Sequence, residues 1–193
     1  NRTQITRMGP RIEALTQELL AGCEASLAER GSFDVIGEYA EPLPVLVICE
    51  LLGAPVADAE ALRAWSQAIV AMYEVAPTEA QQQAAQAACR EFAAYVDALA
   101  QDRARHPKDD LLTSLVEARD GSDRLSSREL IATAVLLLNA GHEASVNGFG
   151  NGFNSLVSQA DQAAVVEAIE RPGGVDLIVE EMLRHDSPLH LFE

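Results

Sequence analysis

The sequence predicts a mainly α-helical fold built around one long central helix. Apolar residues recur at intervals of three and four along most of the chain, which is the spacing of one helical face. Aromatic residues make up only 5% of the chain, and the 12 glycines and 8 prolines are spread thinly, which does not favour a β-sandwich. The 193 residues, 48% of them hydrophobic, can bury a core without disulfides. We find no internal repeat or linker and expect residues 1–193 to form one domain or one piece of a domain.

The charge balance excludes several partners. The chain carries 30 acidic and 14 basic residues, so its formal net charge is −16. A field of that sign repels phosphate backbones and anionic lipids, and we expect no nucleic-acid partner. No apolar run reaches the roughly 20 residues of a membrane span, and the first residues do not resemble a secretory signal. These features predict a soluble, cytoplasmic protein without a membrane partner.

Cysteine and histidine give no sign of a metal site. Cys23, Cys49 and Cys89 lie far apart within helical patterns, and we interpret all three as buried free thiols. The four histidines show none of the spacings of a zinc site.

The first quarter of the chain predicts two helices. The first runs from Pro10 to Arg30, with the proline in its first turn and Gly31 at its end. Residues 33–36 could form an isolated strand. Residues 45–52 are apolar nearly all round and predict a buried helix, although their β-branched members leave a strand open.

Capping residues mark the next three helices. Asp58 is expected to cap a helix that extends to Met72, and Thr78 opens another through a capping-box pattern with Gln81. Asp110 then caps a short helix, which is followed by a loop at residues 120–123.

The central helix begins at a second capping box, formed by Ser126 and Glu129, and can continue to about Ser158. Such a helix would be roughly 48 Å long at 1.5 Å per residue. Residues 130–138 are apolar on nearly every side, so we expect neighbours all around this part.

The second half of the central helix is rich in glycine. Each glycine in a helix interior costs roughly 0.5 to 1 kcal/mol relative to alanine. Glycine permits close approach of another backbone or of a flat ligand, and the titratable His142 and Glu143 lie within the same segment. A ligand groove that contains an acid, and close helix packing with Glu143 reaching solvent, both remain open. The glycines are Gly141, Gly148, Gly150 and Gly152.

Two motifs together carry a family resemblance. The stretch from Leu136 to Ser145, which reads LLLNAGHEAS, resembles the oxygen-binding segment of soluble bacterial cytochromes P450, usually Ala-Gly-x-Glu/Asp-Thr-Thr/Ser. Glu181-Met-Leu-Arg184 resembles the Glu-x-x-Arg motif of that family, although such a pair by itself is usually a solvated surface pair. Residues 42–55 and 109–116 are also similar to family members, and the four segments follow in the same order.

The resemblance implies a partial P450 helical fold and a role for each matching residue. Ala140, Gly141 and Ala144 would lie against a haem, and Glu143 would be the acid that relays protons for oxygen activation. The substrate pocket would be lined by Leu136, Asn139 and Ala140. Glu181 and Arg184 would form a structural ion pair.

The chain departs from the family pattern in two ways. Ala144 stands where the family usually has an alcohol, and Ser145 follows one residue later, rotated by about 100° on a regular helix. A local widening at Gly141 that swings Ser145 inward, a substrate hydroxyl or an ordered water could complete the relay. The chain also ends at Glu193, before the family's cysteine loop, so we expect the axial ligand of the iron to lie outside this chain.

The implied function is that of a haem-thiolate monooxygenase whose intact parent carries haem b. It would insert one oxygen atom of O2 into a small apolar organic substrate, with electrons from NAD(P)H delivered through a ferredoxin-type donor. The alternative is a non-catalytic helical binding or assembly module derived from the same segment. An apolar central helix without its covering would also expose a patch that favours self-association.

Overall fold

The computed structural model describes residues 2–120, 123–158 and 161–187. Helices make up most of these residues, which confirms the predicted mainly α-helical fold. The α-helices are α1 (Arg2–Arg30), α2 (Pro42–Leu52), α3 (Ala59–Val70), α4 (Glu79–Arg105), α5 (Leu111–Glu117), α6 (Ser127–Ser158), α7 (Gln162–Glu170) and α8 (Gly174–His185). A π-helical turn, η1 (Ile36–Ala40), two 3₁₀ turns, η2 (Val56–Asp58) and η3 (Ala71–Tyr73), and a hairpin of β1 (Arg119–Asp120) and β2 (Asp123–Arg124) complete them.

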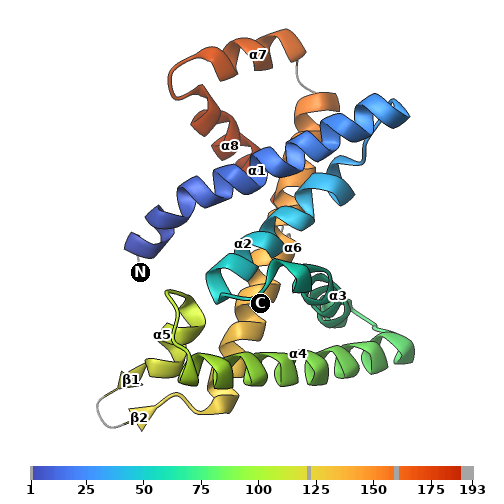
Figure 1. Ribbon diagram of the computed structural model, residues 1–193. Coiled ribbons are helices and arrows are strands. Elements are labelled where there is room, and N and C mark those ends of the chain that lie inside the picture. The colour runs from blue at the N-terminus through green and yellow to red at the C-terminus, as the bar shows by residue number, and fades with distance from the viewer. Residues whose placement is uncertain (1, 121–122, 159–160, 188–193) are drawn as a thin grey trace.

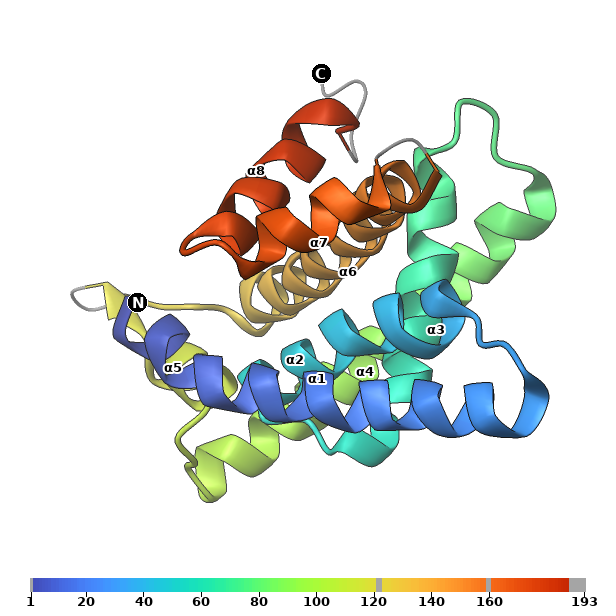
Figure 2. The ribbon, with the colours of Figure 1, turned by 90° about the horizontal axis from the view of Figure 1, so that it is seen from above.

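The long helix α6 organises the other elements. In Figure 1 it runs the height of the molecule, with α4 packed near its beginning and α8 near its end. Seen from above in Figure 2, α1 and α2 lie on one side of α6, and α7 and α8 lie on the other. None of the described helices combines the length and hydropathy required to span a bilayer.

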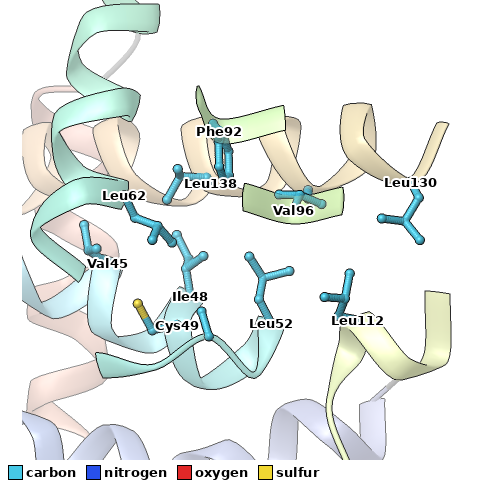
Figure 3. Close-up of a cluster of buried hydrophobic side chains, with 12 residues drawn as sticks. Val45, Ile48, Cys49, Leu52, Leu62, Phe92, Val96, Leu112, Leu130 and Leu138 are labelled. Atoms are coloured by element: carbon cyan, nitrogen blue, oxygen red, sulfur yellow. The ribbon is translucent and has the colours of Figure 1, made fainter. Parts of the chain in front are cut away.

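The hydrophobic core lies between α2 and the first half of α6. Helices α3, α4 and α5 close it, and their side chains meet there as Figure 3 shows. Leu138 and Phe92 are fully buried in this cluster. Its buried members are Val45, Ile48, Cys49, Leu52, Ala54, Leu62, Phe92, Val96, Leu112, Leu130, Ala134 and Leu138.

Three of the predicted helix starts are confirmed in atomic detail. The Thr78 hydroxyl accepts a hydrogen bond from the Gln81 backbone N–H, and the Gln81 side chain accepts one from the Thr78 N–H. Ser126 and Glu129 form the same reciprocal pair, and Asp110 accepts from the Thr113 N–H at 2.7 Å. These bonds satisfy N–H groups that have no partner inside the helix.

The N-terminal expectations were wrong in two respects. Helix α1 begins at Arg2, eight residues earlier than predicted, so Pro10 lies inside it. Residues 33–36 do not form a strand, because the Glu38 carboxylate accepts hydrogen bonds from the Asp34 N–H and the Ser26 hydroxyl. These contacts hold the segment in a turn that leads into η1.

The predicted cap at Asp58 is absent. Helix α3 does begin at residue 59, but the Asp58 side chain makes no capping bond. It accepts a hydrogen bond from the Tyr95 hydroxyl of α4 at 2.9 Å instead. The hydrogen bond from Tyr95 therefore replaces the predicted bond between the Asp58 side chain and the start of α3.

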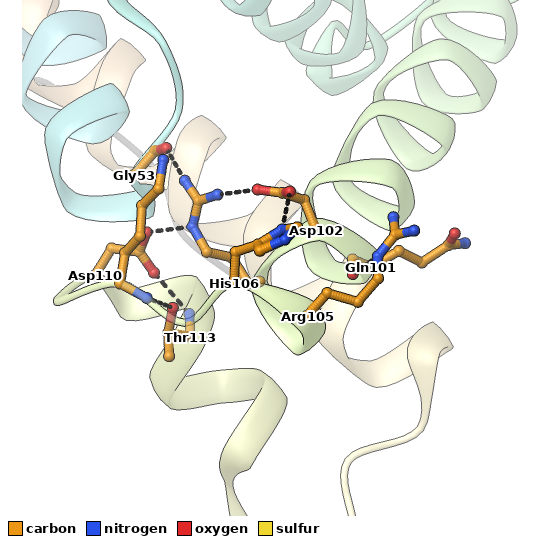
Figure 4. A network of polar contacts seen from close by, with 9 residues as sticks. Gly53, Gln101, Asp102, Arg105, His106, Asp110 and Thr113 are labelled. Carbon is orange, nitrogen blue, oxygen red and sulfur yellow. Dashed lines mark hydrogen bonds and ion pairs between the residues drawn. The ribbon is translucent and has the colours of Figure 1, made fainter.

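A buried ion pair joins α4 to the beginning of α5. The Arg103 guanidinium is 2% exposed and donates to the Asp110 carboxylate at 2.5 Å. It also donates to the carbonyl oxygen of Gly53, which follows α2 with a φ of 73° (Figure 4). Burial raises the pKa of Asp110, but hydrogen bonds from Arg103 and Thr113 outweigh this and hold the pKa below its ordinary value.

The first half of α6 is covered on one side only. Leu130, Ala134 and Leu138 are buried, whereas Leu136 is 65% exposed. The expectation of neighbours all around this segment was therefore wrong for the part of the chain that the structure describes. Leu136 does expose apolar surface on this helix, whereas the patch that favours self-association stays a prediction.

Candidate functional site

A narrow apolar surface runs along the uncovered side of α6. Leu136, Ala140 and Ala144 follow at intervals of four residues, so their side chains share one side of the helix. Leu136 and Ala140 are exposed and Ala144 is half-buried. We call these three residues the exposed strip. Two alanines after one leucine leave a nearly flat apolar surface without a charged group.

Gly141, Gly150 and Gly152 of α6 serve helix packing. A Cβ atom at Gly141 would lie 3.1 Å from the Ile48 Cδ1 of α2, and one at Gly150 would lie 3.2 Å from the Ile36 Cδ1 of η1. Gly152 lies even closer to Met182 of α8. Close helix packing, one of the two interpretations that the sequence left open, therefore accounts for these glycines. Gly141 directs its missing side chain at α2 rather than at the exposed strip, and its contact with a haem stays a prediction.

Glu143 lies one position before Ala144 and is half-buried. Its carboxylate accepts a hydrogen bond from the Asn147 side-chain amide, one turn later, at 3.3 Å. Asn147 was not predicted as a site residue, although its spacing of four from Glu143 is the sequence signal that could have found it. A carboxylate held beside an apolar surface can deliver protons to that surface.

Ser145 is exposed, and its hydroxyl donates a hydrogen bond to the Gly141 carbonyl oxygen at 2.8 Å. Helix α6 is α-helical from residue 127 to residue 158, so the hypothesis of a local widening at Gly141 is not supported in this structure. The serine hydroxyl is thus engaged one turn back along its own helix.

Asn139 lies apart from the exposed strip. Its side chain is 7% exposed, and its Oδ1 accepts a hydrogen bond from the Ser66 hydroxyl of α3 at 3.1 Å. The amide oxygen is therefore used in helix packing. The predicted contact of Asn139 with substrate has no support in this geometry and stays a prediction.

His142 is the buried titratable group closest to the site in sequence. Its Nδ1 lies 3.2 Å from the Ser66 hydroxyl, whereas its Nε2 has no hydrogen-bond partner among the described residues. Burial lowers the pKa of His142, and the nearby carboxylates of Glu143 and Glu41 only partly oppose this. The ring is therefore neutral near pH 7. No sequence signal connects it to Ser66, which lies 76 residues away.

Glu181 and Arg184 form a bidentate ion pair on α8. Arg184 donates from Nε and Nη2 to the two carboxylate oxygens at 2.7 and 2.6 Å. Both side chains are exposed, and Glu181 also lines a groove of about 270 Å³ between α6 and α8. The predicted role of the pair in the framework around a haem stays a prediction.

The cysteines are free, as expected, but only two of them are buried. Cys23 and Cys49 lie in the interior, where burial raises the pKa of Cys49 to about 11, whereas Cys89 is exposed on α4. The interpretation of Cys89 as buried was therefore wrong, because Cys89 lies on the solvent-facing side of α4. Within residues 2–120, 123–158 and 161–187, no three histidine, cysteine or acidic side chains are grouped as metal ligands.

The helix arrangement is that of a cytochrome P450, and the chain belongs to this family. No family model matches the chain. It is 39% identical over 187 residues to vitamin D(3) 25-hydroxylase of Pseudonocardia autotrophica, and 38% identical over 186 residues to 6-deoxyerythronolide B hydroxylase of Saccharopolyspora erythraea. Each alignment covers 96% of this chain and 43% of the relative.

A solved structure shows the same fold. The myxobacterial cytochrome P450 CYP267B1 in complex with myristic acid superposes with a TM-score of 0.82 at 34% identity. The match covers 97% of this chain and 44% of that protein. The chain thus spans less than half the length of the bacterial cytochromes P450 that it matches.

Proposed function

We propose that this chain forms the oxygen-side part of a haem monooxygenase that oxidises small apolar organic substrates. The exposed strip beside the Glu143 carboxylate carries the proposal, because haem-based oxygen chemistry needs a flat apolar surface next to a proton donor. Support also comes from the two relatives named as hydroxylases, which align with nearly all of the chain.

The residues of the exposed strip fit a haem. Leu136 offers apolar contact, and the methyl groups of Ala140 and Ala144 leave space for a planar ring. A haem with a thiolate ligand supplies the activation of dioxygen. Burial raises the pKa of Cys23 and Cys49 and disfavours their thiolates, and Cys89 belongs to α4 rather than to the helix of the exposed strip, so we assign the axial ligand to a cysteine outside residues 1–193.

The reaction consumes the substrate C–H bond, one O2, two electrons and two protons, and it releases an alcohol and water. The electrons would come from NAD(P)H through a ferredoxin-type donor. In this chain, Glu143 would take up protons from solvent and release them at the exposed strip. Asn147 would orient the carboxylate through the bond to its Oε1.

The alcohol of the relay is missing at Ala144. Because the Ser145 hydroxyl donates to the Gly141 carbonyl, it is not free to donate to a group on the strip at the same time. We therefore assign the missing hydroxyl to the substrate or to an ordered water. Ser145 would contribute only after its bond to Gly141 breaks.

A reduced-minus-oxidised CO difference spectrum tests the function. The haem-loaded intact protein that carries this chain should show the red-shifted Soret band of a thiolate-ligated haem. Added myristic acid should change the spin state of the ferric protein, because an apolar ligand displaces water near the iron. A protein that shows neither signal would refute the monooxygenase and favour a helical binding module.

A further inference from the structure

The buried polar side chains of the described residues form two separate clusters. One contains Arg103 and Asp110, with Thr113 beside them, and it joins α2, α4 and α5. The other contains Ser66 of α3 together with Asn139 and His142 of α6. The second cluster contains neither Glu143 nor a residue of the exposed strip, so the proposed chemistry does not use it.

The hydrogen bonds of the second cluster have a fixed direction. The Ser66 hydroxyl has one proton, which it donates to the Asn139 Oδ1 at 3.1 Å. Its contact with the His142 Nδ1 at 3.2 Å therefore requires the ring N–H to be the donor. The imidazole is then the neutral Nδ1–H tautomer, and its Nε2 is a buried acceptor.

This chain of bonds fixes the register of α3 on α6. Apolar contacts such as those of Leu62 are non-directional and tolerate sliding of one helix along the other. A slide by one turn would leave the buried polar groups of Ser66, Asn139 and His142 without partners, which is costly where they are 0 to 7% exposed.

The register matters because of what lies next to the cluster on each helix. On α6, Asn139 and His142 flank Ala140, the middle residue of the exposed strip. On α3, Ser66 lies one turn before the end of the helix, which continues into η3 and the exposed Tyr73. The cluster therefore ties the end of α3 to the turn of α6 that carries the strip.

We propose that the Ser66–His142–Asn139 cluster is a positioning device that holds the end of α3 and η3 at a fixed place relative to the turn of α6 that carries the exposed strip, so that a bulky ligand meets a wall that is already ordered. The effect of the cluster on ligand binding rests on the proposed function, whereas its effect on the packing of α3 against α6 does not. Ser66 and His142 act as positioning residues and take no part in proton transfer.

The test compares Ser66→Ala and His142→Phe in the haem-loaded intact protein with the matched variant Ser114→Ala, which removes a hydroxyl from α5. Two probes that bind haem iron through nitrogen, imidazole and the bulkier 4-phenylimidazole, are titrated by the shift of the Soret band. We expect each cluster variant to weaken 4-phenylimidazole binding by about fivefold or more, because a loosened wall must be ordered on binding. Imidazole binding should change by less than about twofold, and Ser114→Ala should affect neither probe.

The double variant Ser66→Ala/His142→Phe should bind 4-phenylimidazole no more weakly than either single variant, because the cluster acts as one unit. Equal changes for both probes, or no change for either, would overturn the positioning role.

In the protein without haem, backbone amides of residues 66–73 should exchange hydrogen faster in Ser66→Ala than in Ser114→Ala. Equal exchange in the two variants would also overturn it. A wild-type protein that shows neither the thiolate CO band nor the spin-state change with myristic acid would refute the proposed function, while the exchange measurement would still decide the role of the cluster.

Discussion

A Cβ atom at Gly152 of α6 would lie 2.6 Å from the Cβ atom of Met182 of α8. Real Cβ atoms do not approach so closely, and a Met182 Cβ cannot move without its backbone. The contact therefore fixes how near α8, with its Glu181–Arg184 pair, can approach the second half of α6. It explains why a helix tolerates glycine here at a cost in helix propensity.

Replacement of this glycine should destabilise the protein. We expect Gly152→Ala to lower the free energy of unfolding by about 1 to 3 kcal/mol, because overpacking outweighs the gain in helix propensity. Gly22→Ala is the matched control, since Gly22 lies in α1 with no atom near its Cβ position. That variant should gain roughly 0.5 to 1 kcal/mol. Thermal unfolding monitored by circular dichroism measures both, and equal melting temperatures would contradict the packing role.

The buried pair of Arg103 and Asp110 should give stability that depends on pH. Asp110→Asn removes the buried partner of Arg103 and leaves only the half-exposed Asp102 carboxylate beside the guanidinium, so it should cost about 3 kcal/mol near pH 7, at the low end for a broken buried pair. Because the pKa of Asp110 is lowered in the folded state, its contribution is present above the unfolded pKa of about 3.9 and is lost as the pH falls through the folded pKa. Urea unfolding at pH 7 and pH 3 should show the difference between the proteins narrowing in acid. A difference that stays constant would show that the carboxylate is not the stabilising group.

Glu143→Gln should reduce turnover and leave haem binding intact. Loss of a proton-relay carboxylate typically costs 10² to 10⁴ in rate, so we expect kcat to fall by about 100-fold or more. The CO difference spectrum should be unchanged, because the amide keeps the shape of the side chain. Glu167→Gln on α7 is the control for the loss of a carboxylate that lies in an exposed pair with Arg171. Comparable turnover in the two variants would remove Glu143 from the relay.

The roles of Ser145 and Ala144 can be separated by the coupling of oxygen use to product formation. Ser145→Ala should raise hydrogen peroxide release relative to product if the serine leaves its bond to Gly141 during turnover. Ala144→Thr should restore an alcohol at the family position and lower peroxide release. Simultaneous measurement of peroxide, product and NAD(P)H consumption tests both variants. Unchanged coupling in Ser145→Ala would assign the hydroxyl to substrate or water alone.

Arg184→Ala should have little effect on the unfolding of this part of the protein, because the ion pair is exposed and screened by solvent. If the pair supports the framework around a haem, the intact protein should nevertheless retain less haem after purification. The ratio of Soret to protein absorbance measures this loss. Arg171→Ala, which breaks an exposed i,i+4 pair on α7, is the control. Equal haem content in the two variants would make Glu181–Arg184 an ordinary surface pair.

Much of the fold could be predicted from the sequence because its signals are local. The Thr78–Gln81 and Ser126–Glu129 capping boxes each join residues three apart, and they mark helix starts without reference to the rest of the chain. The motif that contains Glu143 could be found for the same reason, since its residues are contiguous. Asp58 shows the limit of this reasoning. Its carboxylate accepts a hydrogen bond from the Tyr95 hydroxyl, 37 residues away, and so does not cap the helix as predicted.

The sequence by itself determined the mainly helical class, the long α6 and the resemblance to cytochromes P450, because helix periodicity, caps and short motifs are properties of neighbouring residues. Only the tertiary structure decided which side of α6 is covered. It placed Ile48 against Gly141, buried Asn139 and His142 against Ser66, and left Leu136 exposed. These outcomes depend on which distant helices pack together, and burial and long-range hydrogen bonds are fixed only when those surfaces meet.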